Sequence, residues 1–208
     1  MAKVEDNATK TLINETSISP TKAEEAMTEY CQTQGDIRVH GKSSCVYTVS
    51  HKTNSFAENV LWSIRPYARK TDAYAMSSVR KWSVRTVKAS QQVSQCTKNH
   101  SIPAVIFSTA GYTGNHFHEF SDIIIPLFLT CAQFNGQVQL IITDKKPWWI
   151  VKHQAFLKKL SNYEIMDIDR DDEVHCFPKV IVGLKRYHKE LSIAPQKYSY
   201  SIKDFRDF

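Results

Sequence analysis

Residues Pro103-Ala104-Val105-Ile106-Phe107-Ser108 form a short apolar run, and a run of this length is typical of a strand buried on both faces of a sheet. A glycine-bearing turn follows it, and residues 115–134 then have the pattern of a helix ended by Asn135-Gly136. Residues 138–142 are the next apolar run and predict a second buried strand.

The same alternation continues toward the C-terminus. Pro147 predicts the first turn of a second helix that runs through Leu160. Residues 163–168 predict a third strand, and residues 180–182 predict a fourth that ends at Gly183. Strands that alternate with helices at this spacing indicate a parallel sheet with crossover helices, which is the α/β fold class.

The N-terminal half has a different pattern of polar and apolar residues. Residues 1–18 are polar and lack a period, and Ser19-Pro20 predicts the start of a short helix to about Cys31. Short strands and one helical turn (72–80) follow; the strands are expected at residues 37–39, 45–49, 61–65 and 82–87. We therefore divide the chain into a tail with a short helix (1–34), a β-rich segment (35–102) and an α/β domain (103–208).

Composition limits the class of protein. The chain has 208 residues, of which 42% are hydrophobic, and this is enough for a packed core. Its longest uninterrupted apolar run, residues 123–129, is far short of the roughly 20 residues that span a bilayer. The chain also lacks the basic start and apolar stretch of a signal peptide, so we expect no membrane span in it.

The formal net charge of +6 is concentrated in one block. Residues 31–100 carry eleven Lys or Arg against three Asp or Glu, a net charge of +8. Such a block faces a nucleic acid, an acidic glycan or only solvent. No RNP or helix-turn-helix pattern supports nucleic-acid binding, so we expect no nucleic-acid partner.

The segment from Gly111 to Asp122 carries the candidate chemistry. It lies at the carboxyl end of the first parallel strand, where ligands bind in open α/β sheets. His118 and Asp122 are four residues apart and share one helix face, so the carboxylate can orient the imidazole and raise its basicity. Asn115, at the helix start, can cap the helix or reach a ligand.

The other polar residues of this segment are weaker candidates. His116 lies about 160° from His118 around the helix, which disfavours a shared site or a metal site with Asp122. Gly111 and Gly114 make a phosphate cradle possible, but GxxG is neither a dinucleotide fingerprint nor a P-loop.

Three further features have competing interpretations. Trp148-Trp149 can stack on a sugar, although core packing is favoured. The acidic run 167–173 lacks the glycine of a calcium loop, so a solvated loop is favoured. The sequons at Asn7, Asn14 and Asn99 mark either glycosylation in a luminal protein or chance. None of the five cysteines forms a CxxC pair.

Taken together, several motifs closely resemble plant members of glycosyltransferase family 61, from about Tyr30 to Phe208. The motifs are Gly35-Asp-Ile-Arg-Val-His-Gly, Trp62-Ser-Ile-Arg-Pro-Tyr-Ala-Arg-Lys, Cys96-Thr-Lys-Asn-His, Pro103-Ala-Val-Ile-Phe-Ser, Gly111-Tyr-Thr-Gly-Asn-His-Phe-His, Ile123-Ile-Ile-Pro-Leu-Phe-Leu-Thr, Ile142-Thr-Asp-Lys-Lys-Pro-Trp-Trp and Glu173-Val-His-Cys-Phe-Pro.

The resemblance implies a GT-B type fold, of which this chain is the Rossmann-like N-terminal half with a β-rich extension. It implies an inverting transfer of a sugar, with a pentose expected, from a UDP-sugar to a cell-wall polysaccharide such as xylan in the Golgi lumen, with no metal required. The family pattern Asn-x-x-His-x-x-x-Asp falls on Asn115, His118 and Asp122. His118 is then the base or acceptor contact, Asp122 its orienter, and His116 a second-rank alternative.

The chain departs from the family in extent. The membrane anchor and the second Rossmann-like domain of family members have no counterpart in it, so we expect a fragment that is inactive or weak alone. The alternative is a non-catalytic fragment that binds acceptor glycan or a partner protein. Cys31 and Cys96 flank the β-rich segment, and we predict that they form a disulfide, which leaves Cys45, Cys131 and Cys176 free.

Overall fold

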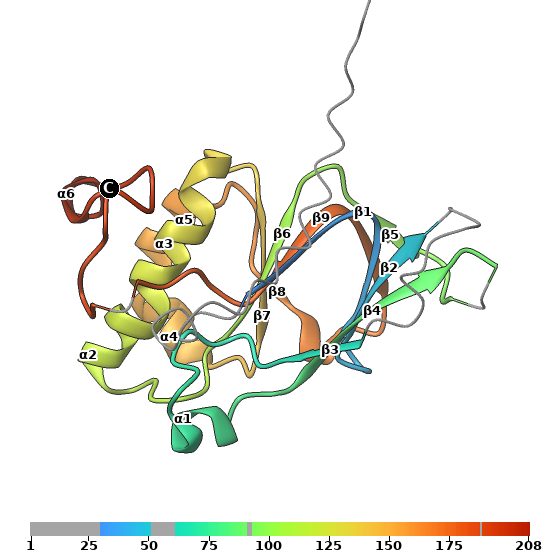
Figure 1. Ribbon diagram of the computed structural model, residues 1–208, viewed down its shortest axis with the longest axis horizontal. Helices are drawn as coiled ribbons and strands as arrows, with labels where there is room; N and C mark the ends of the chain where they lie inside the picture. The colour runs from blue at the N-terminus through green and yellow to red at the C-terminus, as the bar shows by residue number, and fades with distance from the viewer. Residues whose placement is uncertain (1–29, 51–60, 91–92, 188) are drawn as a thin grey trace, which may run out of the picture.

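The computed structural model describes residues 30–50, 61–90, 93–187 and 189–208. Its strands are β1 (Cys31–His40), β2 (Cys45–Ser50), β3 (Leu61–Ile64), β4 (Trp82–Lys88), β5 (Lys98–Asn99), β6 (Ala104–Ser108), β7 (Gln139–Thr143), β8 (Met166–Asp167) and β9 (Val174–Val182). They join in one mixed sheet of order β3-β4-β2-β1-β9-β6-β7-β8, with β5 paired to β9 (Figure 1).

The helices and helical turns are α1 (Ala73–Ser77), α2 (His116–His118), a π-helical turn (Glu119–Ile124), α3 (Ile125–Cys131), a 3₁₀ turn (Ala132–Phe134), α4 (Pro147–Lys152), α5 (Gln154–Leu160), a second 3₁₀ turn (Ile168–Arg170) and α6 (Ile202–Asp207). The helical segments expected at 72–80, 115–134 and 147–160 are present, whereas α6 and the 3₁₀ turn after β8 were not predicted. The helical segment predicted over 115–134 is therefore confirmed, but a π turn interrupts it. The helix predicted over 147–160 is divided at His153.

The C-terminal half is a parallel sheet with crossover helices, as predicted. β9, β6, β7 and β8 are neighbours and all run parallel. Figure 1 shows α3, α4 and α5 together on one face of these strands. Every residue of β6 and β7 is buried, because the side chains on both faces of these strands pack against apolar residues.

The two faces of β6 belong to two separate parts of the core. Val105 and Phe107 pack with the helical layer, which includes Leu127 of α3. Ala104 and Ile106 pack with a second cluster, formed by apolar side chains from the N-terminal strands; these include Ile37, Val39, Val46, Ile64, Trp82 and Val84. The β-rich segment therefore covers the sheet face opposite the helices.

β9 joins the two halves of the sheet. It pairs antiparallel with β1 through registers such as Val39↔His175 and parallel with β6 through Ala104↔Val180. It begins at Val174, six residues before the fourth strand that the sequence predicts. Hydrogen bonds of one continuous sheet therefore cross the expected boundary between residues 102 and 103.

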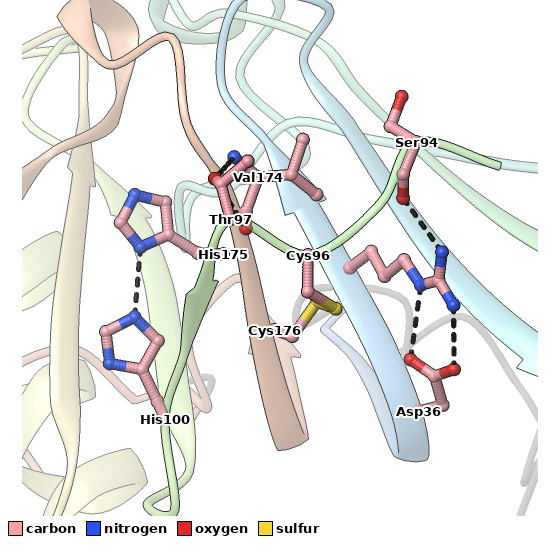
Figure 2. Close-up of a disulfide and its surroundings, with 9 residues drawn as sticks. Asp36, Ser94, Cys96, Thr97, His100, Val174, His175 and Cys176 are labelled. Atoms are coloured by element: carbon pink, nitrogen blue, oxygen red, sulfur yellow. Dashed lines mark hydrogen bonds and ion pairs between the residues drawn. A yellow bond between two sulfur atoms is a disulfide. The ribbon is translucent and has the colours of Figure 1, made fainter.

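The predicted disulfide between Cys31 and Cys96 is wrong. Cys96 is bonded to Cys176 of β9 instead, with a Cα–Cα distance of 5.8 Å (Figure 2). Cys31 lies opposite Val182, six residues further along β9 than Cys176, and a strand rises about 3.3 Å per residue. That displacement puts the Cys31 thiol out of reach of a disulfide with Cys96. Cys31, Cys45 and Cys131 are free thiols.

The acidic run 167–173 is tied into the fold more closely than the predicted solvated loop. Asp169 accepts hydrogen bonds from the Thr143 hydroxyl at 2.7 Å and from the Asp144 N–H at 2.6 Å. Asp171 is 3.0 Å from the His175 ring. These carboxylates hold the end of β7 and the start of β9, and only part of the run faces solvent.

Some predictions fall outside the described residues. These are the sequons at Asn7 and Asn14 and most of the helix expected from Ser19; its last residue, Cys31, opens β1 instead. Asn99 is exposed on β5. In the part of the chain that the structure describes, no helix has the length and apolar character needed to cross a membrane.

Candidate functional site

Asp122 is the centre of the candidate site. It lies in the π turn after α2, and its side chain is completely buried. One oxygen, Oδ2, accepts from Tyr67 Oη at 3.1 Å and Arg69 Nε at 2.9 Å, and it lies 3.1 Å from His118 Nδ1. The other, Oδ1, accepts from Ser121 Oγ at 2.7 Å. Buried carboxylates need such partners, because an unpaired buried charge is strongly destabilising.

His118 is oriented by this carboxylate, as the sequence predicts. Because Nδ1 faces the Asp122 carboxylate, the neutral imidazole has its hydrogen on Nδ1. Nε2 then has a lone pair and no hydrogen-bond partner among the described residues. The side chain remains 21% exposed, so a substrate can approach it. A base held by a second group in this way is the arrangement of general-base catalysis.

Local structure fixes the position of His118. Asn115 caps α2, and its side-chain oxygen accepts from the N–H groups of Phe117 at 3.0 Å and His118 at 3.4 Å. Asn115 is therefore a helix cap that acts on His118 through the backbone. The π turn begins directly after His118, and π turns inside helices are frequent at functional sites.

A second layer of charge surrounds Asp122. Arg69 also contacts Glu190, and Arg186 Nη2 lies 2.9 Å from the same Glu190 carboxylate and 3.5 Å from Asp122 Oδ1. Burial, followed by the negative charge of Asp122, raises the pKa of Tyr67 far above its ordinary value. Burial lowers the pKa of Arg69, but its bonds to the two carboxylates outweigh this and the net shift is upward. Both groups therefore remain proton donors to Asp122.

Glu119 is a second buried carboxylate beside the site. It accepts from Lys152 Nζ at 2.5 Å and from the Gly114 N–H at 3.1 Å, and it lies 3.0 Å from His153 Nε2. Burial raises its pKa, but the hydrogen bonds from Lys152 and His153 outweigh burial, so the net shift is downward. Glu119 thus ties the loop before α2 to the junction of α4 and α5.

The two glycines of this loop make bonds within the protein. The Gly111 N–H donates to Ser78 Oγ at 3.0 Å, and the Gly114 N–H donates to Glu119. A phosphate at the predicted cradle would have to displace these acceptors. Gly111 has φ +64°, and a Cβ at this position would overlap the ring of Tyr67, so the close approach to Tyr67 requires glycine.

His116 does not join the Asp122 cluster, in agreement with its place on the opposite side of the helix. It is exposed, and its ring packs against Phe120 at a centroid distance of 5.0 Å.

The two adjacent tryptophans have different environments: Trp149 is fully buried in the core, whereas Trp148 is 48% exposed.

One group of potential metal ligands occurs among the described residues, and it lies away from Asp122. It consists of Asp36, Cys96 and Cys176. Because the two sulfur atoms are bonded to each other, neither is a thiolate that can bind an ion.

Sequence reasoning found His118 but none of the other partners of Asp122. Tyr67 and Arg69 stand in the motif 62–70, but no local pattern relates them to a helix more than 50 residues away. Arg186 follows β9 and approaches Asp122 only through the fold, and Glu190 pairs with Arg186. Glu119 did carry a signal, since it lies between His118 and Asp122, but its burial was not expected.

The chain matches no protein-family model. Over most of its length it is similar to plant arabinosyl- and xylosyltransferases, which is consistent with the resemblance to glycosyltransferase family 61. These relatives include the Alpha-1,3-arabinosyltransferase XAT3 of Oryza sativa subsp. japonica, which is 44% identical over 86% of this chain and 30% of its own length.

Two other relatives extend the comparison. The Beta-1,2-xylosyltransferase XYXT1 of the same organism is 35% identical, over 86% of this chain and 42% of that protein. The Xylan glycosyltransferase MUCI21 of Arabidopsis thaliana is 36% identical, over 86% of this chain and 37% of that protein. The chain therefore spans well under half the length of these curated relatives.

Proposed function

We propose that this chain carries the base and the acceptor side of a glycosyltransferase that adds a pentose to a cell-wall polysaccharide such as xylan. The observation that supports this proposal most strongly is the His118–Asp122 pair, with Nδ1 and Oδ2 3.1 Å apart at the carboxyl end of the parallel strands. The names of the homologous proteins indicate arabinose, xylose and xylan as the sugars concerned.

The proposed step is an inverting transfer from a nucleotide sugar. His118 Nε2 takes the proton of an acceptor hydroxyl while that oxygen bonds to the anomeric carbon of the donor. The bond from this carbon to the diphosphate breaks, and the nucleoside diphosphate leaves with the electron pair. The imidazolium that forms is stabilised by the Asp122 carboxylate on Nδ1.

We further propose that the sheet is the Rossmann-like N-terminal half of a GT-B type enzyme and that the protein acts in the Golgi lumen. The parallel order β9-β6-β7-β8 with crossover helices supports the first point. The Cys96–Cys176 disulfide supports the second, because disulfides persist in oxidising compartments.

A chimera tests the proposed function. This chain replaces the matching segment of XAT3, and the purified chimera is incubated with UDP-arabinose or UDP-xylose and xylohexaose. We expect a xylohexaose product that carries one added pentose, detected by mass spectrometry. A chimera that unfolds cooperatively at the temperature of the parent enzyme but transfers neither pentose would contradict the proposal.

A further inference from the structure

Aromatic rings form a column around the candidate base. Tyr74 of α1 stacks on Tyr112 with a centroid distance of 5.9 Å, and Tyr112 lies 4.5 Å from the His118 ring. Phe117, the residue before His118, packs edge-on against the His118 ring at a centroid distance of 5.2 Å. Figure 1 shows α1 and α2, which carry the two ends of this column, at the same end of the molecule.

The two ends of the column are the exposed rings. Tyr74 is 78% exposed and Phe117 is 40% exposed, whereas Tyr112 and His118 are half-buried between them. Exposed large aromatic side chains that gather at one place mark a binding surface. They supply rigid apolar faces at a low entropic cost, and tyrosine adds a polar tip.

The column is held in place before any ligand binds. Tyr112 Oη donates to Asp72 Oδ2 at 2.9 Å, and the Tyr112 N–H donates to Tyr67 Oη at 3.3 Å. Asp72 also caps α1 by accepting from the Ala75 N–H at 2.9 Å, and this fixes the helix that carries Tyr74. Side chains that are ordered in advance lose less freedom on binding.

We propose that Tyr74 and Phe117 are the acceptor-binding platforms on the two sides of His118, and that their ligand is an extended, uncharged pentose polymer. A pyranose ring has an apolar face of C–H groups, which packs on an aromatic ring, and a hydroxyl edge, which stays free to react. Contacts on both sides of the base suit a sugar in the middle of a chain. This inference rests on the proposed function, from which it takes the acceptor class.

The test measures xylohexaose binding to the 208-residue chain by titration calorimetry. Tyr74→Ala and Phe117→Ala are each expected to weaken binding about threefold to tenfold, which is the range for one aromatic contact. Tyr74→Phe keeps the ring and is expected to bind as the unchanged chain does. The matched control is Tyr163→Ala, because Tyr163 is also exposed (39%) but lies before β8, away from the column.

The outcomes separate this inference from the proposed function. Binding that depends on Tyr74 while the chimera transfers no sugar would support the platforms and contradict the transferase proposal. Three results would overturn the platforms whatever the chimera does: no xylohexaose binding by the unchanged chain, equal binding by Tyr74→Ala, Phe117→Ala and Tyr163→Ala, or displacement of xylohexaose by uridine diphosphate. Melting temperatures of the variants identify any loss that comes from unfolding.

Discussion

At the scale of single residues, the site depends on how Asp122 is satisfied. Its carboxylate is buried, yet hydroxyl, guanidinium and imidazole groups from two distant parts of the chain reach it. A buried acceptor that loses one donor cannot recover the bond from water. The stability of the site is therefore sensitive to individual donors, including ones that take no part in chemistry.

Tyr67→Phe tests this dependence. The change removes a buried hydroxyl that donates to Asp122 and accepts from the Tyr112 N–H. We expect the free energy of unfolding in urea to fall by about 1.5–3 kcal/mol, the range for hydrogen bonds to charged groups. Tyr163→Phe is the control, because its hydroxyl bonds to Gln137 at an exposed position and its loss is expected to cost about 0.5 kcal/mol or less. Equal losses for the two variants would contradict the account of Asp122.

The sequence predicts only the local part of this site. A spacing of four residues places His118 and Asp122 on one face, and the structure confirms that they meet. Tyr67 and Arg69 are 55 and 53 residues from Asp122, so their approach depends on tertiary packing. The π turn was also not predicted, because no residue in 119–124 gives a local signal for it.

At the scale of elements, β9 connects the parts of the fold. The sequence predicts β6 and β7 well, because each is a short apolar run whose two faces are buried. It predicts only the last residues of β9, since the first half, with His175 and Pro178, has no continuous apolar pattern. That half is stabilised by strand pairing with β1 and β5 and by the disulfide to Cys96, and these contacts are distant in sequence.

The disulfide gives a prediction for this element. Cys176→Ser opens a link between residues 80 apart in sequence, and we expect it to lower the free energy of unfolding by roughly 2–4 kcal/mol. Cys31→Ser, which removes a half-buried free thiol, is expected to cost about 1 kcal/mol or less. Non-reducing peptide mapping should recover Cys96 joined to Cys176. A Cys96 peptide joined to Cys31, or free thiols at both positions, would refute this pairing.

At the scale of the whole molecule, a half-buried histidine, His100, and a buried one, His153, make stability depend on pH. Burial, then the neighbouring His175 charge, lowers the pKa of His100 below 6.5. Burial also lowers the pKa of His153, although Glu119 opposes it. The unfolded chain therefore binds these protons at a higher pH than the folded chain does, and stability is lost as the pH falls below 6.5 toward the folded-state pKa values.

We accordingly expect the thermal midpoint to be lower at pH 5.5 than at pH 7.5. His100→Gln should reduce this difference, because the amide can still donate toward His175 but does not titrate. Thermal unfolding followed by circular dichroism at the two pH values measures it. A midpoint that rises on acidification, or an unchanged difference in His100→Gln, would contradict the assignment.

His118 is proposed to be the base of the sugar transfer, and this claim can be tested against His116, two residues away. His118→Ala in the XAT3 chimera is expected to lower kcat about 10²- to 10⁴-fold, because general-base catalysis is lost. The ring of His116 packs on Phe120 outside the Asp122 cluster, so His116→Ala should leave kcat within about threefold of the unchanged chimera. A folded His118→Ala chimera that keeps its turnover, or a larger loss in His116→Ala, would contradict the claim.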